Sequence, residues 1–371
     1  MSKRRTYALF TPRKYFLVVL AVLLLFVLAA PLVLAQTGTE EGPLTERFTS
    51  GEGRYATVAG GAGLEGLSSN TVSLNVPGQA VIAAYLYWAG VNLDGAPDDP
   101  DVGFQVDGGA VNSITADVTY GPSFWYTDYG TGDTFNHNVY VEDVTSFVQL
   151  GTHNYTLSGY TVTGPVGSSL AYGFGLIVVY EDSTLPLANV TLLDGLDSVY
   201  YGFQPPQDSP SEVNCVTFEA NTLDRVMDFT VFVGGSEDSG STNRPNSLHY
   251  VTGNGALPGD VTGAPGNVEI IDPFTSADGD AWDTYSQTIV IPAGDTYACF
   301  QTQSDGDRGN GASFLWLMGG TTLREQTPTA VSLSTFSADN PVALPAAGVV
   351  LALLLLGSVT GLALVRRRPS A

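Results

Sequence analysis

The sequence lacks lysine along nearly its whole length, with none after Lys14. Of the 14 basic residues, eight lie at the two ends, and the other six are arginines between Arg47 and Arg324. All 37 acidic residues lie between Glu40 and Asp339, so the body of the chain has a net charge of 6 minus 37, or −31. Such a charge repels phosphate backbones and anionic lipids, which excludes nucleic acid as a partner. Calcium sites or a carboxylate shell suited to a saline habitat would each explain the acidity.

Catalytic motifs are also missing. The sequence has no Gly-x-Ser-x-Gly elbow, no His-Glu-x-x-His pair, no phosphate-binding loop and no dinucleotide fingerprint. Among 37 acidic residues, some carboxylate pairs will be close by chance. His137 and His249 have no identifiable nucleophile nearby in the sequence, so we expect them to be polar surface or turn residues. We therefore expect no enzymatic activity.

Long hydrophobic runs occur at the two ends of the chain. Basic residues precede an apolar run that leads to the small residue Ala35, so residues 1–35 are a predicted signal peptide cleaved there. An uncleaved signal anchor is the alternative. Residues 346–365 can span a bilayer as a helix, and residues 366–371 form a basic cytoplasmic tail with Arg366, Arg367 and Arg368. The pattern predicts a single-pass cell-surface protein with its acidic body outside.

The residues around the start of this helix resemble a sorting motif. The order Leu344-Pro345-Ala346-Ala347-Gly348, an apolar span and then arginines resembles the cell-wall sorting signal of Gram-positive surface proteins, where a sortase cleaves Leu-Pro-x-Thr-Gly. Ala347 stands where that family has the threonine that forms the acyl intermediate. The resemblance implies cell-wall attachment. The alternative is a short turn in front of an ordinary membrane helix.

Between the ends, the sequence has the pattern of an all-β protein. Gly, Pro, Asn, Asp and Ser recur about every ten residues, which is typical of short strands joined by turns. Nearly continuous apolar runs at 83–88 and 176–180 indicate strands buried on both faces. The length of about 300 residues predicts two β-sandwiches, jelly-roll-like or Ig-like, at 44–185 and 186–325. A stalk rich in Thr, Ser and Pro follows at 326–345.

Four segments resemble an uncharacterised module that recurs in large bacterial and archaeal envelope proteins. They are AYLYWAG at 84–90, VYVEDVT at 139–145, GLIVVYED at 175–182 and VTLLDGL at 190–196. The resemblance covers roughly Leu67 to Leu323. It implies an extracellular β-sandwich and a surface location, and it brings no catalytic residues to transfer.

The chain has only two cysteines, Cys215 and Cys299, both in the part that we expect to be exported. In an oxidising compartment an even pair predicts one disulfide. Its loop of 84 residues (299 minus 215) would stabilise the fold by about 4 to 5 kcal/mol in the loop-entropy model. The cysteines and histidines lack zinc-ligand spacing.

Two loops alternate carboxylate or amide side chains with glycines, as calcium ligation requires. The candidate ligands are Asp278, Asp280, Asp283, Asp305, Asp307 and Asn310. Neither loop continues to the glutamate that closes an EF-hand, and Arg308 in the second loop opposes a cation. Ordinary Asp-Gly hairpin turns are the alternative. Calcium is the only cofactor that the sequence suggests.

A turn-rich stretch concentrates aromatic side chains, namely Tyr120, Phe124, Trp125, Tyr126 and Tyr129. If exposed, these rings would form a stacking platform for a sugar or a partner protein. If buried, they would fill one end of the first sandwich, which is the interpretation that we favour, because aromatic rings are the usual core of sandwiches.

The sequence thus predicts a membrane-anchored extracellular protein with a structural, adhesive or ligand-display role. Surface glycans or other envelope proteins are the expected partners, besides the membrane that the terminal helices contact. A calcium-dependent carbohydrate-binding protein is the first alternative, and an exported hydrolase is the second.

Overall fold

The computed structural model describes residues 42–325, apart from 97–98, 163–169, 204–207 and 237–243. All the regular elements in these residues are β-strands, so the predicted all-β class is confirmed. No helix within the described ranges is long and apolar enough to cross a membrane. The predicted signal segment, stalk, sorting motif and terminal helix all lie outside the described residues.

The strands form four antiparallel sheets, which we number I to IV. Sheet I consists of β3 (Ser69–Val76), β9 (Gly151–Ser158), β5 (Asp101–Val106) and β6 (Asn112–Thr115). Sheet II consists of β2 (Tyr55–Gly63), β10 (Ala171–Glu181), β4 (Ala80–Leu93), β8 (Thr134–Asp143) and β7 (Val118–Thr127). Sheet III consists of β1 (Thr45–Gly53), β11 (Ala188–Val199), β18 (Phe314–Arg324), β13 (Arg225–Gly234) and β16 (Trp282–Ile291). Sheet IV consists of β12 (Asn214–Thr217), β17 (Tyr297–Ser304), β14 (Asn246–Gly253) and β15 (Val268–Ile271).

The two halves of the chain order their strands in the same way. Among β11 to β18, sheet III takes the first, eighth, third and sixth strand, and sheet IV takes the second, seventh, fourth and fifth. Sheets II and I repeat this order with β2 to β10, where the β7–β8 hairpin stands in the place of β16. Strand β1 precedes the first half in the sequence, and yet it pairs with β11 at the edge of sheet III.

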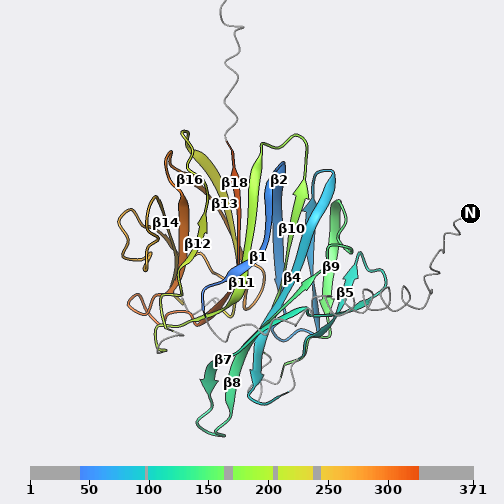
Figure 1. Cartoon of the computed structure of the whole chain (residues 1–371). Coiled ribbons are helices and arrows are strands. Elements are labelled where there is room, and N and C mark those ends of the chain that lie inside the picture. Colours follow the sequence, from blue (N-terminus) through green and yellow to red (C-terminus); the bar gives the residue numbers. More distant parts are fainter. Residues whose placement is uncertain (1–41, 97–98, 163–169, 204–207, 237–243, 326–371) are drawn as a thin grey trace, which may run out of the picture. The chain divides into compact units, whose positions relative to one another are not determined.

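Apolar side chains fill three spaces between the sheets, which therefore stack in the order I, II, III, IV (Figure 1). The space between sheets I and II contains Val72, Trp88, Phe104, Tyr155 and Phe174. The space between sheets II and III contains Tyr87, Val139, Ile177, Phe232 and Leu317. The space between sheets III and IV contains Phe229, Val231, Leu248, Phe300 and Trp316.

The inner sheets II and III are therefore buried on both faces. Along β4, Leu86 and Trp88 pack towards sheet I, while Tyr87 and Ala89 pack towards sheet III. This is the alternation that a strand imposes on successive side chains. It explains the nearly continuous apolar runs and confirms that they belong to strands buried on both faces.

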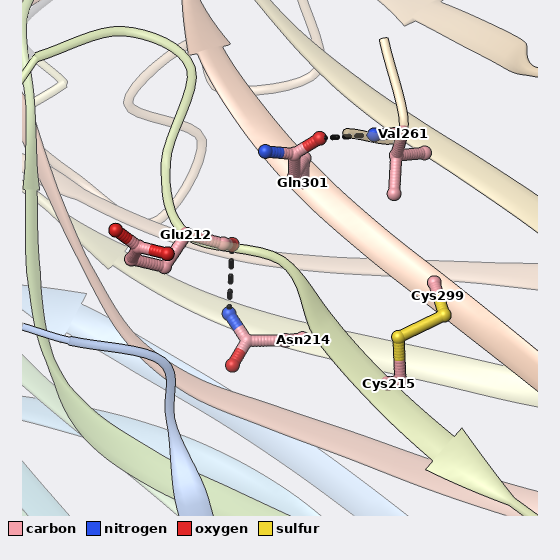
Figure 2. Close-up of a disulfide and its surroundings, with 6 residues drawn as sticks. All are labelled: Glu212, Asn214, Cys215, Val261, Cys299 and Gln301. Atoms are coloured by element: carbon pink, nitrogen blue, oxygen red, sulfur yellow. Dashed lines mark hydrogen bonds between the residues drawn. A yellow bond between two sulfur atoms is a disulfide. The ribbon is translucent and has the colours of Figure 1, made fainter. Parts of the chain in front are cut away.

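The predicted disulfide is present. Cys215 of β12 and Cys299 of β17 lie directly opposite each other in the ladder of sheet IV (Figure 2). Two positions along β17, the Gln301 side chain accepts a hydrogen bond from the Val261 N–H and donates one to the Ser211 carbonyl. Val261 is fully buried against Cys299, so the loop between β14 and β15 covers the outer face of sheet IV.

Candidate binding surface

The aromatic stretch from residue 118 to 127 is a strand, β7, and not the turn-rich segment that we predicted. Its pairing with β8 is irregular in two places, between Tyr120 and Ser123 and between Phe124 and Tyr126. Gly121-Pro122 falls in the first irregularity. Proline has no N–H to give to the ladder, so within a strand it is tolerated where the pairing is interrupted, as it is at a bulge. The Gly-Pro pair thus marks a bulge here.

The five aromatic residues predicted in this stretch differ in where they lie. Tyr120 is buried, and its hydroxyl donates to Asp194 of sheet III at 2.6 Å. Trp125 packs at the edge of the core between sheets II and III. Phe124 and Tyr126 are each 41% exposed, and Tyr129 at the hairpin tip is 93% exposed. The stretch therefore both fills the core and presents rings to solvent.

A second aromatic segment, which we did not predict, follows β11. Tyr200 contacts Tyr201 with ring centroids 4.7 Å apart, and it contacts Phe203 at 5.0 Å. Phe203 in turn meets Phe124 of the hairpin at 5.9 Å. The run Tyr-Tyr-Gly-Phe directly after an apolar strand was visible in the sequence as a signal.

Among the described residues, four large aromatic side chains are exposed, and all four belong to these two segments. They are Phe124, Tyr126, Tyr129 and Tyr201. Together with Tyr200 and Phe203 they form what we call the aromatic surface. Phe124 and Tyr201 are linked through Phe203 and Tyr200, and Tyr126 and Tyr129 follow Phe124 along the hairpin. Exposed rings on adjoining segments are typical of an interaction site.

Tyr201 also brings the second predicted calcium loop to the aromatic surface. A β-carbon at Gly306 or at Gly311 would lie only 2.3 Å or 3.0 Å from atoms of its ring. The Tyr201 hydroxyl is 3.4 Å from Oδ1 of Asn310. The glycines of this loop therefore allow the close approach of an aromatic ring, which is a role that the sequence did not indicate.

In the same loop, the guanidinium group of Arg308 is paired with two carboxylates. Arg308 forms ion pairs with Asp305 and, at 3.7 Å, with Asp272. It also donates a hydrogen bond to the carbonyl of Asn246 at 2.8 Å. Burial raises the pKa of Asp305, and Arg308 opposes this shift. Asp307 and Asn310 remain exposed.

In the first predicted calcium loop, the carboxylates of Asp278 and Asp283 accept hydrogen bonds mainly from backbone N–H groups of the loop and the residue after it. Asp283 is buried and accepts hydrogen bonds from the backbone N–H groups of Thr275, Ser276 and Ala277 at 2.8 to 3.1 Å. Asp278 accepts one from the N–H of Thr284 at 2.8 Å.

Asp280 in that loop is exposed. Across the described part of the chain, no three His, Cys, Asp or Glu side chains are grouped as metal ligands. Calcium binding stays a prediction.

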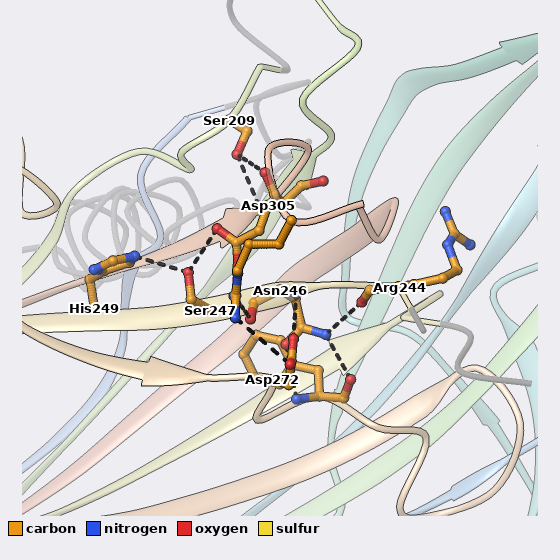
Figure 3. A network of polar contacts seen from close by, with 10 residues as sticks. Ser209, Arg244, Asn246, Ser247, His249, Asp272 and Asp305 are labelled. Carbon is orange, nitrogen blue, oxygen red and sulfur yellow. Dashed lines mark hydrogen bonds and ion pairs between the residues drawn. The ribbon is translucent and has the colours of Figure 1, made fainter. Parts of the chain in front are cut away.

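His249 is buried in strand β14, so our expectation of a surface or turn residue is wrong for it. It belongs to a polar network with Ser247 and Asp305 (Figure 3). Asn267 also belongs to this network. The Asn267 amide donates to the Thr262 carbonyl and lies 3.1 Å from Nδ1 of His249, which must therefore accept.

The direction of this network argues against a serine nucleophile. With Nδ1 accepting, Nε2–H of His249 donates to Ser247 Oγ at 2.9 Å, and Ser247 donates to Asp305 at 3.3 Å. A nucleophilic serine needs the opposite polarity, with its proton given to the imidazole. Ser247 is also fully buried. We interpret the network as a means of satisfying buried polar groups.

The aromatic surface lies at a defined end of sheet III. Val199 at the end of β11 pairs with Phe314, the first residue of β18, and the segment with Tyr201 follows directly. The described chain leaves the sheet beyond Arg324, which pairs with Ala188 at the other end. Strand β18 has 11 residues, so about 35 Å separates these two ends.

No family model matches the chain, and no curated protein matches it. Among solved structures, the chain has 9% identity and a TM-score of 0.22 with a structure of Sulfolobus turreted icosahedral virus, over 77% of this chain and 95% of that one. Recombinant peptide:N-glycanase F gives 12% identity and a TM-score of 0.23, over 74% and 96%. Infectious bursal disease virus, Gx strain, gives 10% and 0.23, over 80% and 78%. At these scores the likeness carries no argument about function.

Proposed function

We propose that the chain is a membrane-anchored protein of a bacterial or archaeal envelope that binds a ligand outside the cell through its aromatic surface. In this proposal, segment 1–35 directs export, and helix 346–365 with its arginine tail retains the protein. Between them, two jelly-roll-like sandwiches project on the stalk 326–345. The strand order supports this architecture, because eight strands arranged as two Greek keys make a jelly roll.

The observation that carries the proposal is where the exposed rings lie. Phe124, Tyr129 and Tyr201 belong to the end of the fold opposite the point where the chain continues towards the predicted anchor. A protein held at its C-terminus presents the far end to its surroundings. Large exposed rings at that end serve adhesion or ligand display, and the proposal includes no catalytic step.

Anchoring is tested by fractionating cells that express the full chain or a version that ends after Pro345. We expect the full chain in the membrane fraction, with its acidic body open to added protease. The shortened chain should be released to the medium. Extraction of the full chain by detergent supports membrane retention, whereas release only after digestion of the cell wall would favour covalent attachment at the Leu344-Pro345 motif.

Binding is tested by the adhesion of cells that display the full chain to surfaces coated with envelope material. Replacing Phe124 and Tyr129 by serine should lower adhesion at least fivefold, because the ring contacts are lost. The matched control replaces Leu223 and Val290 by serine, since these side chains are also apolar and exposed, at 45% and 59%, on other segments. Equal adhesion by all three proteins would contradict a role for the aromatic surface.

A further inference from the structure

Tyr201 combines an exposed ring with polar neighbours. Its side chain is 45% exposed, and it lies against the backbone of the loop that carries Asp307 and Asn310. Both of these residues are exposed, and the amide oxygen of Asn310 lies 3.4 Å from the Tyr201 hydroxyl. One flat apolar face thus has a carboxylate and an amide in the adjoining loop.

The loop is held in place by groups of the protein itself. Backbone N–H groups of Asp305 and Ala312 both donate to the carbonyl of Pro245 at 3.1 Å, which ties the two ends of the loop to one point. Arg308 supplies the positive charge between Asp305 and Asp272. The backbone of the loop that carries Asp307 and Asn310 is therefore positioned in advance, which lowers the entropy lost when a ligand binds.

The combination of groups fits a sugar. A pyranose ring has an apolar C–H face that stacks on an aromatic ring, and its hydroxyl groups at the edge match carboxylate and amide acceptors and donors. The charge of the protein narrows the class of sugar further, because the part of the chain between its two basic ends has a net charge of −31 (6 minus 37) and repels anionic sugars.

We propose that Tyr201, Asp307 and Asn310 form a subsite for a neutral sugar residue of an extracellular glycan, and that the subsite works without calcium. Tyr201 provides the stacking face, and Asp307 and Asn310 bind hydroxyl groups. The guanidinium of Arg308 takes the place that a calcium ion would have in the loop. This inference rests on the proposed function, since it names the ligand of the aromatic surface.

The test measures binding of neutral oligosaccharides to the full chain in a detergent without a sugar headgroup. Probes are soluble β-glucan, mannan and chitin oligosaccharides, with polygalacturonate as the anionic comparison, each in the presence of a chelator and then of calcium. We expect saturable binding of at least one neutral glycan, an unchanged affinity in the chelator, and at least tenfold weaker binding of polygalacturonate.

Two variants locate the subsite. Tyr201→Ala should weaken binding of the neutral glycan at least tenfold, whereas Tyr201→Phe, which keeps the ring, should stay within about threefold of the parent protein. Asp307→Asn should weaken binding about fivefold, and because its side chain is exposed, the fold is preserved. The matched control is Leu223→Ala, with the same 45% exposure on another segment, and it should bind like the parent.

The outcomes separate this inference from the proposed function. Loss of glycan binding in chelator overturns calcium independence, and full binding by Tyr201→Ala with a preserved melting midpoint overturns the subsite. If no neutral glycan binds while adhesion still depends on Phe124 and Tyr129, the inference falls and the proposed function stands. If adhesion is also independent of these rings, both fall.

Discussion

The two halves of the fold share one strand order and differ in how they treat the outer face of their outer sheet. In sheet I this face is open to solvent and carries small polar side chains. They are Ser69, Thr71, Ser73, Asn75, Thr152 and Asn154. In sheet IV the equivalent face is covered by a loop and crossed by the disulfide.

The difference between these two faces shows that polar side chains on a covered sheet need hydrogen-bond partners within the protein. Hydroxyl and amide side chains on an open face bond to water or to each other, as Thr71 and Thr156 do at 2.7 Å. Under the covering loop, Ser247, His249 and Gln301 are buried, and each one needs a partner within the protein. The covered face of sheet IV therefore depends on polar partners within the protein that the open face of sheet I does not need.

The largest expected effect comes from removing the disulfide, which makes the second half more like the first. Cys215→Ser with Cys299→Ser should lower the free energy of unfolding by about 4 to 5 kcal/mol, because the unfolded chain regains the freedom of an 84-residue loop. Urea unfolding followed by tryptophan fluorescence measures it. An unchanged midpoint would mean that the disulfide does not distinguish the halves.

The second prediction concerns two rings in corresponding strands, Tyr155 of β9 and Phe300 of β17, both buried. Either ring replaced by alanine should cost about 4 kcal/mol through the cavity that is left. Because the core between sheets II and III joins the halves, we expect both variants to unfold in one transition detected by every probe. Two separate transitions would show that the halves are stable independently.

The third prediction concerns the contact between the halves. Asp194 of sheet III accepts hydrogen bonds from Tyr87 and Tyr120 of sheet II and pairs with Arg47 at 2.6 Å. Asp194→Asn should lower stability by about 3 kcal/mol, because it removes the nearer charge partner of a half-buried guanidinium, which keeps only Asp117 at 3.6 Å.

The matched control for Asp194 is Asp228→Asn, which breaks the more exposed ion pair with Arg324. It should cost less than about 1 kcal/mol. Equal effects of the two substitutions would contradict a special role for Asp194 at the contact between the halves.

The smallest predicted effect is a pH dependence from His137, which is buried in β8 and not a surface residue as we expected. Its ring contacts Ser198 Oγ at 2.7 Å and the Tyr172 hydroxyl at 2.9 Å, and burial lowers its pKa from 6.5 to about 3. Below pH 6.5 the unfolded chain binds a proton that the folded chain refuses, so stability is complete above this pH and falls towards pH 3.

At pH 5 the loss attributable to His137 should be about 2 kcal/mol. His137→Gln should lack this part of the pH dependence, and the difference between the two unfolding curves from pH 7 to pH 5 measures it. Parallel curves would show that His137 titrates alike in the folded and unfolded chain.

Much of the fold was predictable from local pattern. The apolar runs at 83–88 and 176–180 predicted strands buried on both faces, and the two cysteines predicted the disulfide. Strands β1 and β2 were not predicted, because the glycine-rich segments 51–53 and 60–63 resemble loops in sequence. Strand β7 was predicted as turns, since Gly121-Pro122 is a turn signal elsewhere.

The candidate site was predictable only in pieces. The rings at 124–129 and the loop with Asp307 were each noted in the sequence, but nothing local indicated that they belong together. Tyr201 and Phe203, which connect them, lie about 75 residues after the hairpin and about 105 before the loop. Ring contacts over such separations depend on how the strands are ordered.

The sequence by itself determined the strand class, the pairing of its only two cysteines and the partition of charge, because each follows from local periodicity or from a count. Tertiary structure decided which carboxylates are free. Asp194 and Asp283 look like any other aspartate in the sequence, and yet packing buries both with partners, while Asp307 stays exposed in the loop that Tyr201 contacts. The reason is that a side chain's burial and partners are set by the strands that pack around it, and these come from distant parts of the chain.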